Sequence, residues 1–145
     1  MEVKSMRKVN VSNLVGLDAF EGGFYHKKFV EESLKQRAEV LKHLSAEDMV
    51  KVAAIVGGEV VDLKIGEATG WAIMVKPLPN LEIFYILQRG EPEFEDRIHV
   101  LFSKDALNLG IPAEDVADFV VLYANALIYA ARKVRNDLPK ISRYL

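Results

Sequence analysis

The stretch Leu87–Ala106, LQRGEPEFEDRIHVLFSKDA, holds the side chains with the clearest potential for chemistry. Four carboxylates fall close together after a glycine, two arginines flank them, and a histidine follows on an alternating strand. Clustered carboxylates can bind Mg²⁺ or Ca²⁺ through their oxygens, and a neighbouring histidine can act as a general base. The candidate ligand-binding residues are Arg89, Glu91, Glu93, Glu95, Asp96 and Arg97, and the candidate catalytic residue is His99.

The spacing of these carboxylates does not favour a metal site. Pro92 and Phe94 interrupt the acids, no glycine lies at the centre, and no later glutamate stands where a calcium loop needs its bidentate ligand. We therefore predict no metal and a structural turn shaped by Gly90 and Pro92. In this turn Phe94 is expected to pack into the core, while Arg89 and Arg97 neutralise the acids.

The sequence offers little further support for catalysis. His26, His43 and His99 are too far apart in the chain for a helical zinc motif, and no nucleophile motif is present. Because no partner for it is visible in the sequence, His99 is expected to be exposed. A non-catalytic protein is therefore favoured, and the alternative is a small enzyme or metal-binding protein that uses Glu91–Asp96 with His99.

These residues must be positioned by a chain of 145 residues, of which half are apolar and 28% are charged. This composition predicts a folded protein with a single domain over 1–145. Within it we expect an irregular N-terminal segment at 1–24, a helical pair at 25–56, a sheet at 59–103 and a C-terminal helix at 113–136.

Two periodicities define the first half of the chain. Apolar residues recur at helical spacing from Phe29 to Leu44, and Ser45 with Asp48 resembles a capping box at the start of a second helix, which should end at Gly57. Strand-like alternation then begins and predicts four strands, at 60–65, 71–76, 81–87 and 97–103. Short connections favour sequential antiparallel pairing, with the second and third strands inside the sheet. The predicted fold class is therefore α+β, a four-stranded antiparallel meander with helices on one face.

The C-terminal helix is apolar around most of its circumference between Val116 and Val134. Only Asp118, Asn125 and Arg132 form a polar stripe, because they are seven residues apart. Such a helix must be covered on more than one side, and a membrane span would need a longer uninterrupted apolar stretch. We therefore predict a homodimer with this helix at or near the interface.

Composition excludes several classes of function. A net charge of −2 gives no basic surface for nucleic acid. The absence of cysteine excludes disulfides and an iron–sulfur cluster bound by this chain's own thiolates. No membrane association or cofactor is predicted, and the expected location is cytoplasmic. A single threonine and two glutamines among many lysines and glutamates suggest a thermophilic source.

The block from Lys76 to Leu127 resembles a domain-of-unknown-function family of anaerobic bacteria and archaea. The matching features are the Pro-rich connection at Pro77–Pro79, the turn at Gly90–Phe94, the strand at Val100–Phe102 and the helix start at Ile111–Asp115. Some members carry a cysteine-rich cluster-binding segment that this chain lacks. The resemblance implies the fold and an anaerobic or archaeal source. Together these observations predict a non-catalytic binding or accessory module, with an iron–sulfur protein as a possible partner.

Overall fold

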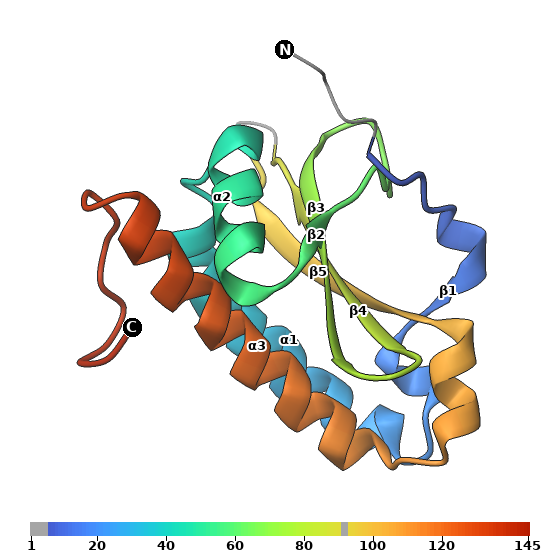
Figure 1. The fold of residues 1–145 in the computed structure, drawn as a ribbon. Helices are drawn as coiled ribbons and strands as arrows, with labels where there is room; N and C mark the ends of the chain where they lie inside the picture. Colours follow the sequence, from blue (N-terminus) through green and yellow to red (C-terminus); the bar gives the residue numbers. More distant parts are fainter. Residues whose placement is uncertain (1–5, 91–92) are drawn as a thin grey trace.

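A computed structural model describes residues 6–90 and 93–145. Its described part contains a five-stranded antiparallel sheet in the order β1-β5-β4-β3-β2, with the long helices on one side (Figure 1). The strands are β1 (Leu14–Val15), β2 (Glu59–Val60), β3 (Thr69–Leu78), β4 (Leu81–Gln88) and β5 (Arg97–Ser103). The α+β class is confirmed. The strand number is corrected from four to five, because β1 adds to the sheet beside β5.

The predicted strand at 60–65 is mostly wrong. Only β2 pairs as a strand with β3, through Glu59 with Met74 and Val60 with Ile73. Beyond this point the chain leaves the sheet edge, and Asp62 forms a parallel bridge with Lys8. The alternation seen in the sequence reflects burial of Val61 and Leu63 against the second face of the sheet rather than strand pairing.

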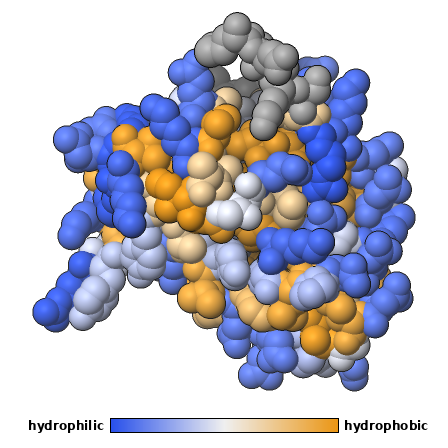
Figure 2. All heavy atoms as spheres, viewed as in Figure 1, coloured by the Kyte–Doolittle hydropathy of each residue, from blue (hydrophilic) through white to orange (hydrophobic). Residues whose placement is uncertain are grey.

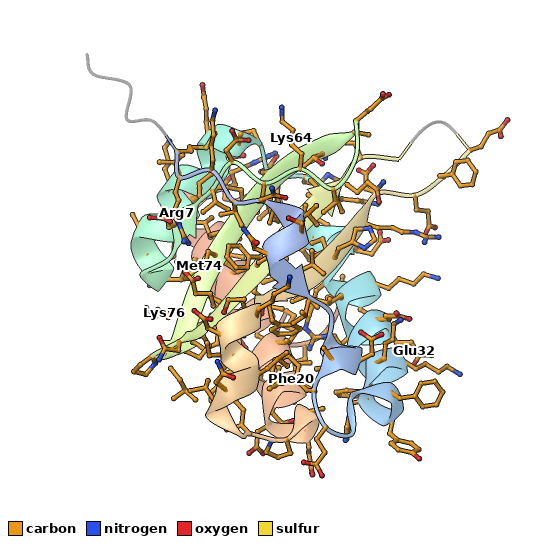
Figure 3. The ribbon with its side chains drawn as sticks, turned by 90° about the vertical axis from the view of Figure 1, so that its right-hand side faces the viewer. Arg7, Phe20, Glu32, Lys64, Met74 and Lys76 are labelled. Atoms are coloured by element: carbon orange, nitrogen blue, oxygen red, sulfur yellow. The ribbon has the colours of Figure 1, made fainter. Side chains whose placement is uncertain are left out.

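Strands β3 and β4 lie inside the sheet, as predicted, and β4 is buried on both faces. Ile83, Tyr85 and Leu87 face the helices, whereas Phe84 and Ile86 belong to a smaller apolar cluster on the second face. The N-terminal segment covers this second face (Figure 3). Arg7 fastens it there through ion pairs with Glu59 at 3.0 Å and Glu82 at 2.9 Å.

The helices are α1 (Gly23–Leu41), α2 (Ala46–Val56) and α3 (Ala113–Val134). The predicted capping box is confirmed, because Ser45 and Asp48 exchange side-chain and backbone hydrogen bonds at the start of α2. Helix α2 ends at Gly57, which adopts the left-handed conformation with φ of 73°. Helix α1 begins before the apolar periodicity that starts at Phe29, because the exposed aromatic side chains of Phe24 and Tyr25 obscure this periodicity in the first turns.

Helix α3 lies beside α1 and also contacts α2 (Figure 1). Two members of its polar stripe are partly buried and contact neighbouring segments. Asn125 accepts a hydrogen bond from Arg37 Nε at 2.6 Å, and Arg132 donates to the carbonyl oxygen of Pro139 at 2.8 Å. Much of the apolar surface that suggested a dimer is thus covered within one chain, although Leu122 and Tyr129 remain exposed. A homodimer through α3 remains a prediction.

Two further features concern the surface. On the face drawn in Figure 2, apolar side chains gather around α2, where Val50 and Ile55 are exposed. Among the described residues, no helix combines the length and apolar character needed to cross a membrane.

Candidate binding groove

The outer edge of β5 is only partly covered by another strand. β1 pairs with Phe102 and Ser103 and then turns away at Gly16. Within the described residues, Arg97–Leu101 pair with β4 on one side and have no strand partner on the other. An edge of this kind presents backbone N–H and C=O groups that can accept an additional strand.

Helix α1 forms a wall beside this edge, and two adjoining hollows of about 400 Å³ and about 300 Å³ run along the boundary. Both are lined by Glu31, Ile98 and His99, so the two hollows adjoin there. We call this feature the α1–β5 groove. From α1 it is lined by Lys27, Val30, Glu31, Leu34, Lys35, Ala38 and Glu39, and it extends from Gly16–Asp18 at one end to Glu95–Arg97 at the other.

The groove has an apolar floor and a charged wall. Val30, Leu34 and Ile98 are buried and form the floor. Lys27, Glu31, Lys35 and Glu39 form one row along α1, because residues four apart lie on the same side of a helix. Within the described part of the chain, Glu39 forms an ion pair with Lys42, whereas the other three have no ion-pair partner.

His99 lies in the middle of the groove and is half-buried, which corrects the expectation that it would be exposed. Its Nε2 donates to Gln88 Oε1 at 2.7 Å. Burial lowers the pKa of His99, the positive charge of Arg97 lowers it further, and Glu31 opposes both effects. The lowered pKa favours the uncharged form of the ring.

The acidic turn contributes only part of its residues to the groove. Asp96 is half-buried, accepts a hydrogen bond from the Gly90 backbone N–H at 2.7 Å and lies 3.5 Å from Arg89. Glu93 and Glu95 are exposed, and Glu91 lies outside the described residues. The predicted anchor is wrong, because the Phe94 side chain is 67% exposed.

The turn is instead held at its base. Arg89 donates to the carbonyl oxygens of Lys42 at 2.5 Å and Leu44 at 3.2 Å, which belong to the connection between α1 and α2. The carbonyl oxygen of Leu44 also accepts from Trp71 Nε1 at 3.1 Å. Arg89 therefore acts as a structural tie rather than as a ligand for the acids alone.

Residues 5–125 match the family model described as Domain of unknown function (DUF3786). The chain belongs to this family. No curated protein and no solved structure matches it. All residues that line the α1–β5 groove lie within the DUF3786 match, whereas the end of α3, residues 126–134, lies beyond it.

The side chains that line the groove of this DUF3786 protein are ionisable or apolar. Its lining contains amines, carboxylates, an imidazole and a guanidinium, but no hydroxyl or thiol among the described residues. No group of three His, Asp or Glu side chains that could hold a metal ion occurs in the described ranges. An open strand edge, an apolar floor and a charged rim are instead features of peptide-binding grooves.

Asp96, Arg97 and His99, which the sequence offers as candidate residues, line one hollow, whereas the α1 wall was not predicted. The signal for the wall is the four-residue repeat of alternating sign from Lys27 to Glu39. Glu31 and Lys35, four residues apart on one side of the helix, belong to this repeat. Their position opposite β5 depends on how α1 packs on the sheet, and no local pattern encodes that packing.

Proposed function

We propose that this protein is a binding or accessory module without catalytic activity of its own, and that it contacts other proteins through the α1–β5 groove. The observation that carries the proposal is the open edge of β5 along the apolar floor of the groove. Main-chain pairing supplies affinity in strand addition, and pockets for alternate side chains supply specificity.

The biological setting is also part of this proposal. The resemblance to proteins of anaerobic bacteria and archaea supports a role in the metabolism of such organisms, in the cytoplasm. Because the chain has no cysteine, any iron–sulfur cluster in the process would be bound through the cysteines of a partner protein. An iron–sulfur protein is therefore one candidate occupant of the groove.

One observation favours a second candidate, a small enzyme. His99 lies in the groove beside Asp96 and has a lowered pKa, as a general base in a cleft would. Against this, the groove lining contains no hydroxyl or thiol that His99 could activate in the described chain. Under the binding proposal, His99→Gln keeps ligand affinity within a few-fold, whereas loss of a turnover activity in this variant would support the enzyme.

Selection of peptides from a random library tests the binding proposal. Selected peptides are expected to shift the backbone NMR signals of β5 and α1. Val100→Arg, which places a long charged side chain in the groove, should abolish their binding. Leu122→Arg on the exposed side of α3 is the matched control and should leave binding unchanged. Peptides that bind Val100→Arg as well as the unmutated protein would contradict the proposal.

A further inference from the structure

The open part of β5 has the form of a self-complementary strand. Arg97–Leu101 are available on the outer edge, and His99 lies at the centre of this window. Two copies of such a strand can pair antiparallel around a two-fold axis perpendicular to the sheet. In this arrangement residues on the same face meet, so Ile98 of one copy lies opposite Val100 of the other and His99 lies opposite its own equivalent.

Helix α1 runs along the same groove, so the two-fold axis that relates two β5 strands also relates two copies of α1. Its residues near position 30 line the hollow at Ile98–Leu101, whereas those near position 36 line the hollow at Glu95–His99. Helix and strand therefore run in opposite directions along the groove. The two hollows meet at Glu31, Ile98 and His99, and the α1 residues that line them run from Lys27 to Glu39, so the midpoint of this row lies at position 33. A two-fold axis that passes close to His99 and to position 33 of α1 places one hollow of each copy against the other hollow of its neighbour.

The charges on α1 are complementary under this operation. Lys27 meets Glu39 of the second copy, and Glu31 meets Lys35, because both pairs have the same midpoint along the helix. At the ends of the groove, Asp18 meets Arg97 of the second copy. A row with charges of one sign would instead repel its own copy. The alternating row thus favours a second copy of this chain over a strongly acidic or basic partner.

We propose that the α1–β5 groove binds the same groove of a second copy, so that two β5 strands join two sheets into one continuous sheet. This inference rests on the proposed binding role of the groove and names its partner. It also places the dimer interface at β5 and α1 rather than at α3.

Reversal of single charges on α1 tests the proposal directly. Glu31→Lys places two lysines opposite each other, and Lys35→Glu places two glutamates opposite each other. Both residues are exposed, so the fold should persist. Each variant is expected to raise the dimer dissociation constant roughly tenfold, because two exposed pairs become repulsive in every dimer. Sedimentation velocity across micromolar concentrations measures this change.

Mixing the two variants separates the interface from effects within the helix. A chain with Glu31→Lys and a chain with Lys35→Glu have complementary rows, so an equimolar mixture should form heterodimers, visible in native mass spectrometry when one chain is isotopically labelled. Glu32→Lys is the matched control, because Glu32 is exposed on α1 outside the groove lining (Figure 3). It should leave dimerisation unchanged.

A cysteine cross-link fixes the register. The chain has no cysteine, so His99→Cys introduces a single thiol close to the proposed axis. Directly opposed residues in antiparallel strands have the Cα separation that a disulfide needs. Mild oxidation should therefore give a covalent dimer for His99→Cys, and Glu32→Cys should remain monomeric on a non-reducing gel.

Several results would overturn this inference. They are a monomer at all concentrations, a dimer insensitive to both charge variants, or a dimer dissociated by Leu122→Glu on α3 instead. A monomer whose groove still binds selected peptides would overturn the dimer and leave the proposed function standing. A monomer that binds no peptide would overturn both.

Discussion

The acidic turn and the α1–β5 groove meet at Glu95 and Asp96, but they are built in different ways. The turn is rich in charge within a few consecutive residues, and its large apolar side chain, Phe94, is 67% exposed. The groove takes its charges from α1, β5 and the segment after β1, and it has a buried floor that includes Ile98 at 7% exposure. The acidic turn therefore has many charged groups but no packed surface around them. The groove instead brings together charged groups from distant parts of the chain, on packed elements.

This difference has a physical cause. A binding site needs side chains whose positions are fixed by packing, because ordering them at the moment of binding costs conformational entropy. Ile98 of β5 is packed in the main core, so the groups beside it are held in defined positions. Glu93 is exposed, lies outside the groove lining and receives no such support.

Truncating one apolar residue in each region should give the largest contrast. Ile98→Ala leaves a cavity under the groove and is expected to lower the free energy of unfolding by about 2–5 kcal/mol. Phe94→Ala removes an exposed ring and should change it by less than about 0.5 kcal/mol. Urea unfolding midpoints compare the two variants. Equal losses would show that the turn packs against the protein in solution.

A substitution at Gly90, at the base of the acidic turn, should lower the stability of the protein more than a substitution at the tip of the turn. A Cβ atom at Gly90 would lie 1.9 Å from the carbonyl oxygen of Phe94, so Gly90→Ala forces the backbone apart. We expect a loss of about 1–3 kcal/mol in stability, as for other overpacked sites. Gly66→Ala is the control, because a Cβ there meets only the Gln88 side chain at 3.8 Å. A neutral Gly90→Ala would mean that the turn adjusts freely.

The pH dependence of the free energy of unfolding should reflect the partial burial of His99 in the groove. Because burial lowers the pKa of His99 below its ordinary value of 6.5, the unfolded chain takes up a proton at higher pH than the folded chain. The stabilisation is therefore complete above pH 6.5 and falls as the pH decreases through the lowered pKa. Urea midpoints measured from neutral to mildly acidic pH should fall more for the unmutated protein than for His99→Gln. Parallel curves would contradict this.

The smallest effect is expected at the tip of the turn. Replacing Glu93 and Glu95 together by Gln should leave stability and the calorimetric response to Mg²⁺ or Ca²⁺ unchanged, because both carboxylates are exposed and outside any described group of metal ligands. A saturable heat of Ca²⁺ binding that disappears in the double variant would show that the turn is a metal site.

Much of the local structure follows from short-range sequence. The Ser45–Asp48 capping box and the end of α2 at Gly57 depend on hydrogen bonds and backbone angles within a few residues, and both were predicted correctly. Strand β4 was recognisable because a strand buried on both faces needs apolar residues throughout. The segment after Val60 was misread, because an extended chain packed over a sheet alternates in the same way as a strand inside it.

The sequence by itself determined the α+β class, the helix termini set by local caps and the residues of β5 that face the core, since these depend on periodicity and neighbouring residues. Only the tertiary structure decided that β1 covers just one end of β5 and that Glu31 and Lys35 stand opposite Asp96, Arg97 and His99. These relations join residues more than sixty positions apart. They arise because α1 packs on the sheet. Nonspecific burial of apolar surface selects this arrangement, and the arrangement in turn fixes where the polar residues at the rim lie.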